Sequence, residues 1–101
     1  MVRHIVSFKL RGTDEERREV CRNFASALRA LPDQIECLRS MEVGINENPA
    51  EEWDLVLTAT VDSMEDVDRY ARHPAHLAAA AIVAPLREAR ACVDYAVGDR
   101  V

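Results

Sequence analysis

Alternation of apolar and polar residues predicts four β-strands along the chain. In residues 2–10, the side that carries Val6 and Phe8 also carries His4. A period of two is typical of a strand with one face turned toward a core. The same alternation recurs in three later segments, at residues 37–46, 53–61 and 90–97.

Apolar residues at a spacing of three and four predict a helix after the first strand. Thr13 and Glu16 have the spacing of a capping box, in which each side chain accepts a hydrogen bond from the backbone N–H of the other residue. The apolar stripe then runs to Leu31, and Pro32 ends the helix.

The second helical region is predicted to break at a proline. Ser63 has the character of an N-cap. Pro74 disfavours helical geometry at His73 and is suited to open a new helix. We therefore expect a helix after Ser63, a break before Pro74, and an alanine-rich helix over residues 75–84.

The order of these elements is β-α-β-β-α-β, which predicts an α+β, ferredoxin-like fold with a four-stranded antiparallel sheet and helices on one face. The uncovered face of such a sheet needs a partner, and a second copy of the chain would supply one as a dimeric α+β barrel. At 101 residues, we expect a single domain over 1–101.

The net charge and the cysteine content limit which partners and which cellular setting are expected. The formal net charge is −5, with 13 basic residues scattered among 18 acidic ones, so neither nucleic acid nor a membrane surface is expected as a partner. Cys21, Cys37 and Cys92 form no CxxC pair, and the N-terminal residues are not an apolar signal. We expect a reduced, cytoplasmic setting in which Cys21 is a buried apolar residue.

The candidate chemistry lies at the helix break, in the segment Tyr70-Ala71-Arg72-His73-Pro74-Ala75-His76. Histidine titrates near neutral pH and suits proton transfer, and a tyrosine hydroxyl can orient it or donate to a substrate. Tyr70 and His76 would lie on different faces of an unbroken helix, so the break at Pro74 is what allows them to meet.

This segment, the opening HIVSFKL and the closing Val93-Asp94-Tyr95 resemble the stress-responsive dimeric A/B barrel family over nearly the whole chain. The resemblance implies a homodimer. The motif is also similar to that of the plant polyketide cyclases of the olivetolic acid cyclase type, which implies that Tyr70 and His76 form a catalytic pair with His4 in the same pocket.

By this resemblance, His76 would be the general base on a C–H beside a carbonyl in a small polyketide-like ligand, and no cofactor would be needed. His73, Phe8 and Leu77 are predicted to contact the substrate. No metal is expected, although His73 and His76 have a spacing that metal ligands can show. The alanines after Leu77 depart from the bulkier pocket expected of the cyclase.

Structural interpretations stand beside each of these assignments. Tyr70 and His76 can pin the helix break through hydrogen bonds to the backbone, His73 can be an N-cap, and His4 can be a satisfied core residue. The alternative function is a non-catalytic dimer that binds an apolar ligand or has a stress-related structural role. A haem or oxygen-dependent monooxygenase is a third reading, for which the sequence offers no clear axial ligand.

Overall fold

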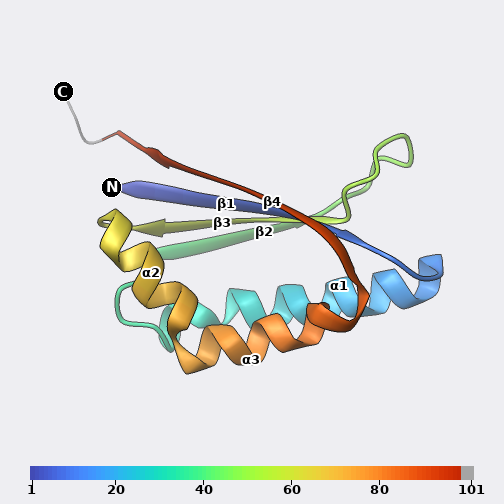
Figure 1. The fold of residues 1–101 in the computed structure, drawn as a ribbon, viewed down its shortest axis with the longest axis horizontal. Helices are drawn as coiled ribbons and strands as arrows, with labels where there is room; N and C mark the ends of the chain where they lie inside the picture. Colours follow the sequence, from blue (N-terminus) through green and yellow to red (C-terminus); the bar gives the residue numbers. More distant parts are fainter. Residues whose placement is uncertain (99–101) are drawn as a thin grey trace.

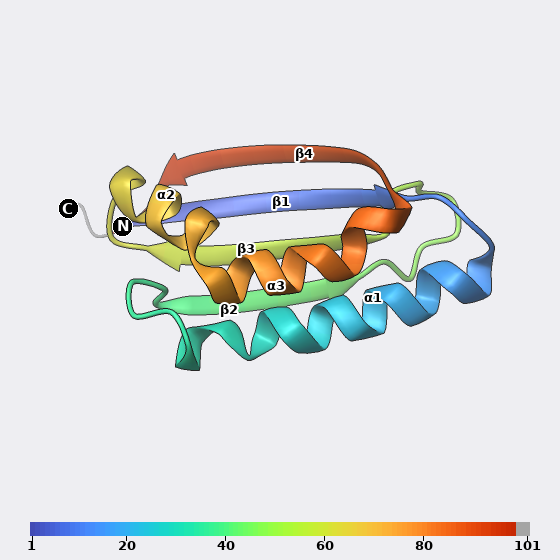
Figure 2. The same ribbon diagram turned by 60° about the horizontal axis from the view of Figure 1, so that its bottom comes forward.

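The computed structural model describes residues 1–98, in which helices cover one face of a single sheet (Figures 1 and 2). The elements, in chain order, are β1 (Val2–Leu10), α1 (Asp14–Arg29), β2 (Ser40–Ile45), β3 (Leu55–Val61), α2 (Met64–Arg72), α3 (Pro74–Val83) and β4 (Arg87–Ala96). Short 3-10 turns at Leu31–Asp33 and Ala84–Leu86 follow α1 and α3.

The sheet has the strand order β2-β3-β1-β4, and each neighbouring pair is antiparallel. This confirms the predicted ferredoxin-like α+β arrangement. In the register, His4 on the central strand β1 lies opposite Ala59 on β3 and Asp94 on β4. The register therefore places the last strand beside the first, at one edge of the sheet (Figure 2).

Three of the predicted strands differ from the observed ones at their ends. The second strand begins at Ser40, because Cys37 still belongs to a turn. The third begins at Leu55, because the Asp54 carboxylate accepts a hydrogen bond from the Leu10 N–H at 2.7 Å and so ends the regular pairing with β1. The fourth strand begins three residues earlier than predicted, at Arg87.

Both predicted helix starts are confirmed. Thr13 accepts from the Glu16 N–H while the Glu16 carboxylate accepts from the Thr13 N–H, which completes the capping box. Ser63 accepts from the Asp66 N–H at the start of α2. The break is also where the sequence predicts it, since α2 ends at Arg72 and α3 begins at Pro74.

The core lies between the sheet and the helices. The rings of Phe8 on β1 and Phe24 on α1 meet edge to face with centroids 5.2 Å apart, a favoured geometry for aromatic pairs. Cys21 is 3% exposed, as predicted, and burial raises the pKa of its thiol to about 11. Leu28 of α1 is fully buried in the same cluster.

The opposite face of the sheet carries exposed apolar side chains. Val56, Val93 and Tyr95 are 39%, 62% and 41% exposed. Strand β4 at the edge packs on β1 and makes at most marginal contact with the helices. Among residues 1–98, no helix has both the length and the apolar character needed to cross a bilayer.

Truncating the core should be far more costly than truncating a matched surface leucine. We expect Leu28→Ala to lower the free energy of unfolding by about 2–5 kcal/mol, because it leaves a cavity under α1. Leu77→Ala, at a position 57% exposed, should change it by less than about 0.5 kcal/mol. Urea unfolding of both variants at one protein concentration checks this, and equal losses would contradict the placement of α1.

Candidate functional site

The break between α2 and α3 is held by two histidine side chains. Pro74 has no N–H, and the Ala75 N–H, which would bond to the Ala71 carbonyl in a continuous helix, instead donates to His73 Nδ1 at 3.0 Å. The freed Ala71 carbonyl accepts a hydrogen bond from His76 Nδ1 at 3.0 Å. The two side chains thus replace one lost backbone bond, one on each side of the break.

This arrangement fixes the proton positions on His76. A carbonyl oxygen can only accept, so Nδ1 of His76 carries a hydrogen and Nε2 of the neutral ring has a free lone pair. Burial lowers the pKa of His76 below its ordinary value of 6.5, the bond to the Ala71 carbonyl partly opposes this, and the electrostatic effects of His4 and Arg90 add a smaller lowering. His76 is therefore a neutral base at physiological pH.

Three aromatic rings from three elements come together beneath the sheet. The Tyr70 and His76 ring centroids are 4.6 Å apart, so the break does bring the pair together. The Tyr70 ring also meets the ring of His4 on β1, with centroids 5.7 Å apart and a T-shaped orientation. His4 is 6% exposed and Tyr70 is 1% exposed.

The Tyr70 hydroxyl is the unusual atom of this cluster. It is buried and has no hydrogen-bond partner among the described residues. Burial raises the pKa of Tyr70 well above its ordinary value, so the hydroxyl keeps its proton and remains a donor. A buried polar atom without a partner destabilises a fold, and such atoms are expected where a ligand supplies the missing partner.

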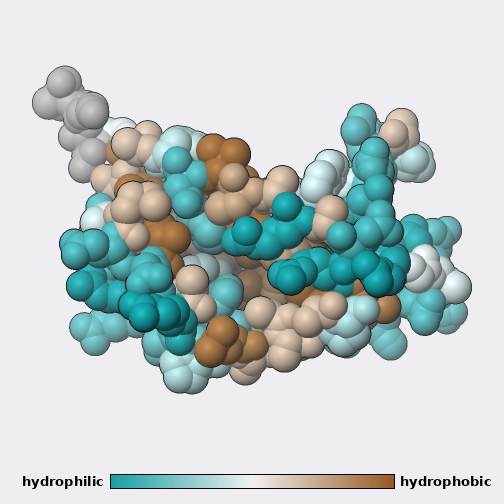
Figure 3. All heavy atoms as spheres, viewed as in Figure 1, coloured by the Kyte–Doolittle hydropathy of each residue, from teal (hydrophilic) through white to brown (hydrophobic). Residues whose placement is uncertain are grey.

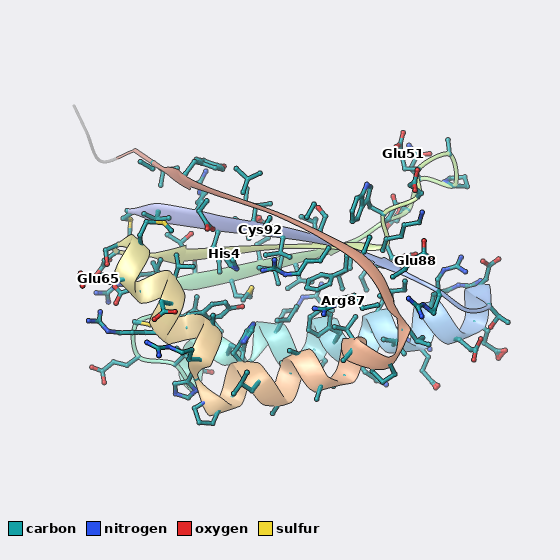
Figure 4. All side chains as sticks on the ribbon, in the orientation of Figure 1. His4, Glu51, Glu65, Arg87, Glu88 and Cys92 are labelled. Carbon is teal, nitrogen blue, oxygen red and sulfur yellow. The ribbon has the colours of Figure 1, made fainter. Side chains whose placement is uncertain are left out.

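Strand β4 adds two groups that the sequence analysis did not assign to the site. His4 Nδ1 donates to the Asp94 carboxylate at 2.5 Å, and Cys92 Sγ lies 3.5 Å from the same nitrogen. Figure 4 shows Cys92 and His4 close to each other on neighbouring strands. Burial and the charge of Asp94 raise the pKa of the Cys92 thiol, and Arg90 opposes this.

The three residues predicted to contact substrate lie elsewhere. His73 caps α3 through its ring nitrogen, Phe8 packs on Phe24 in the core, and Leu77 faces solvent with 57% of its surface exposed. The structure brings together His4, Tyr70 and His76 but places these three outside that cluster. Their proposed contacts with a substrate stay predictions.

Asp94 and Cys92 were missed because their position depends on strand register. The alternation in residues 90–97 puts Val93 and Tyr95 on one side and hence these two on the other. Only the pairing of Val6 with Cys92 and of His4 with Asp94 shows that they share the face of His4. The available signal was an acidic residue, Asp94, between the apolar residues Val93 and Tyr95.

The family follows from comparison with known proteins, because residues 2–97 match the Stress Responsive A/B Barrel Domain. The chain belongs to this family. The uncharacterized protein SCO4036 of Streptomyces coelicolor, a curated relative, is 39% identical over 87 residues, which cover 81% of this chain and 86% of that protein.

Solved structures agree with the A/B barrel assignment. A dimeric protein of unknown function with a ferredoxin-like fold from Bacteroides fragilis is 48% identical, with a TM-score of 0.91 and 93% of each chain covered. The hydroxynitrile lyase of Passiflora edulis shares the fold at 17% identity and a TM-score of 0.70, covering 99% of this chain and 95% of its own. The second likeness is one of fold alone.

The lowered pKa of His76 sets a direction for the pH dependence of stability. The His76 ring binds a proton more readily in the unfolded chain than in the folded one. As pH falls from about 6.5 to below the folded pKa, protonation of the unfolded chain therefore lowers the free energy of unfolding. Above 6.5 it has no such effect. NMR titration of the His76 ring, assigned with His76→Gln, should give a folded pKa below 6.5 and below the value in urea. A value at or above 6.5 would contradict the buried neutral ring.

Proposed function

We propose that this A/B barrel protein performs acid–base chemistry on a small carbonyl compound without a cofactor, with His76 as the base and Tyr70 as the hydrogen-bond donor. The observation that carries the proposal is the bond from His76 Nδ1 to the Ala71 carbonyl. It orients the ring and leaves Nε2 as a base, while the neighbouring Tyr70 hydroxyl has a hydrogen to donate and no partner within residues 1–98.

The proposed step is removal of a proton from the carbon beside the carbonyl. His76 Nε2 takes the proton, the electron pair of the C–H bond moves into the new C=C bond, and the carbonyl π electrons move to oxygen. The Tyr70 hydroxyl donates a hydrogen bond to that developing oxyanion and stays protonated. The resulting enolate can attack a second carbonyl in a ring closure or regain a proton at another carbon.

Access to this pair is expected between β4 and α3. Strand β4 has little contact with the helices, and Figure 3 shows a line of hydrophilic side chains above hydrophobic ones in this region. The Tyr70 hydroxyl is itself closed off from solvent, so a ligand would have to part β4 from the helix pair. Strand β4 lies at an edge of the sheet and has one neighbouring strand, β1, so a ligand that enters here would displace it from the helix side without separating two sheet neighbours.

One structural neighbour indicates that this fold can carry an enzyme activity. The Passiflora edulis protein is a hydroxynitrile lyase on the same fold, so the fold accommodates lyase chemistry. The alanines that follow Leu77 carry little side-chain volume, which favours a polyketide-like or otherwise extended apolar compound. His4, edge-on to Tyr70, would position its ring.

We also propose that the chain is a homodimer through the face of the sheet opposite the helices. Exposed Val56, Val93 and Tyr95 lie on this face, and burying such a patch is a common reason for association. The Bacteroides fragilis relative, 48% identical, is dimeric. A small domain also gains a larger buried core by pairing.

Hydrogen–deuterium exchange at the carbon beside a carbonyl tests the chemistry without knowledge of the natural substrate. Acetophenone in D₂O, followed by NMR, should lose its methyl proton signal faster with the protein than without it. His76→Gln should reduce the added rate by about 10²–10⁴-fold, and Tyr70→Phe by about 10²–10³-fold. Arg69→Gln, on the exposed side of α2, is the matched control and should keep the rate.

Folding must be measured for the same variants. Tyr70→Phe should leave the free energy of unfolding unchanged or raise it, because it removes a buried hydroxyl for which the described part of the chain offers no hydrogen-bond partner. A stable Tyr70→Phe protein without exchange activity supports the proposal. Exchange that persists in a folded His76→Gln protein overturns it, and ligand binding without any exchange in the wild type favours the non-catalytic alternative.

The homodimer is tested by placing a charge on the exposed face of the sheet. Val93→Glu should convert a particle of twice the chain mass of 11.3 kDa into a monomer in light scattering after size exclusion. Met64→Glu places the same charge at a 55% exposed position on α2 and should leave the mass unchanged. A monomeric wild type at micromolar concentration would contradict the proposed interface.

A further inference from the structure

Three atoms of different ligand types converge where β1 and β4 pair near the helices. His4 Nδ1, Cys92 Sγ and an Asp94 carboxylate oxygen all lie within 4.8 Å of one another. The individual separations are 2.5 Å from nitrogen to oxygen, 3.5 Å from nitrogen to sulfur and 3.7 Å from sulfur to oxygen. The register of β1 and β4 creates this triangle, because it sets His4 opposite Asp94.

These separations are close to those of a tetrahedral metal site. With metal–nitrogen and metal–oxygen bonds of about 2.0 Å and a metal–sulfur bond of about 2.3 Å, tetrahedral angles require about 3.5 Å from sulfur to each lighter atom and about 3.3 Å from nitrogen to oxygen. Both sulfur separations already fit. The nitrogen and oxygen must move apart by somewhat less than an ångström, and Asp94 lies on the edge strand with its side chain 23% exposed.

We propose that His4, Cys92 and Asp94 bind one divalent transition-metal ion of the zinc or cobalt type. A set of one imidazole, one thiolate and one carboxylate suits such ions, whereas Mg²⁺ and Ca²⁺ require oxygen ligands. The charges balance, because a thiolate and a carboxylate together neutralise a doubly positive ion. Three protein ligands leave the fourth tetrahedral position for water or a small anion.

Binding requires a defined movement of protons. In the free protein the Nδ1–H of His4 donates to Asp94. When the metal takes the Nδ1 lone pair, the ring adopts the tautomer with its hydrogen on Nε2, and the proton of the Cys92 thiol is released to solvent as the metal–sulfur bond forms. Cys92 is exposed, so the ion has a path to the site.

This inference goes beyond the acid–base proposal and does not depend on it. It departs from the expectation of a metal-free protein, which rested on the lack of a CxxC pair and on the spacing of His73 and His76. Neither of those histidines contributes to the triangle. An ion at this position would hold the ring of His4 against that of Tyr70, 5.7 Å away.

Cobalt titration of tag-free, reduced protein tests the site directly. Co²⁺ bound by a thiolate gives a charge-transfer absorption in the near ultraviolet, and we expect it to saturate at one ion per chain in the wild type. Cys92→Ser should abolish this band, and Asp94→Asn and His4→Gln should weaken binding by at least about 10-fold. Cys37→Ser removes a different, half-buried thiol and should keep the band.

Thermal stabilisation by Zn²⁺ is a second measurement, which does not depend on an absorption band. Excess Zn²⁺ should raise the thermal midpoint of the wild type and of Cys37→Ser, because it binds the folded chain, and should not raise that of Cys92→Ser. Circular dichroism confirms that each variant is folded. No thiolate band in the wild type, or a band and a zinc shift that both survive in Cys92→Ser, overturns the proposal.

Discussion

The missing N–H of Pro74 is the constraint on which the candidate site depends. Because position 74 cannot continue the helix, the chain divides there, and the backbone groups of Ala71 and Ala75 lose each other as partners. The rings of His73 and His76 take their places. The first role of the two histidines around the proline is therefore to supply the hydrogen bonds that the backbone has lost. A second result is an imidazole held in one tautomer beside Tyr70.

The fold could be predicted well because each of its signals is contained in a few neighbouring residues. These signals are the alternation of residues in the strands, the capping box at Thr13 and the break at Pro74. Tyr70 and His76 could be paired by the same reasoning. Asp94 and Cys92 could not be placed, since their meeting with His4 is decided by the register of two strands some 90 residues apart in sequence. Phe8 shows the limit of alternation, which assigns a face but does not distinguish core from pocket.

The two faces of the sheet differ in what covers them. Toward the helices, β1 contributes both core residues and His4, so the site is an extension of the hydrophobic cluster rather than a separate compartment. Toward the other side, β3 and β4 present apolar residues that the single chain leaves in contact with water. Strand β4 belongs to both, since its alternate residues face His4 and the proposed partner subunit. Movement of this strand would therefore couple the oligomer to the site.

Tyr70 combines two roles that are usually given to different residues. Within the nine residues of α2 it is the one fully buried side chain, so its ring anchors the helix to the core. Its hydroxyl, by contrast, gains nothing from that position. Selection for folding alone would let this site drift to phenylalanine over evolutionary time, and persistence of tyrosine among descendants of this chain would record a requirement other than folding.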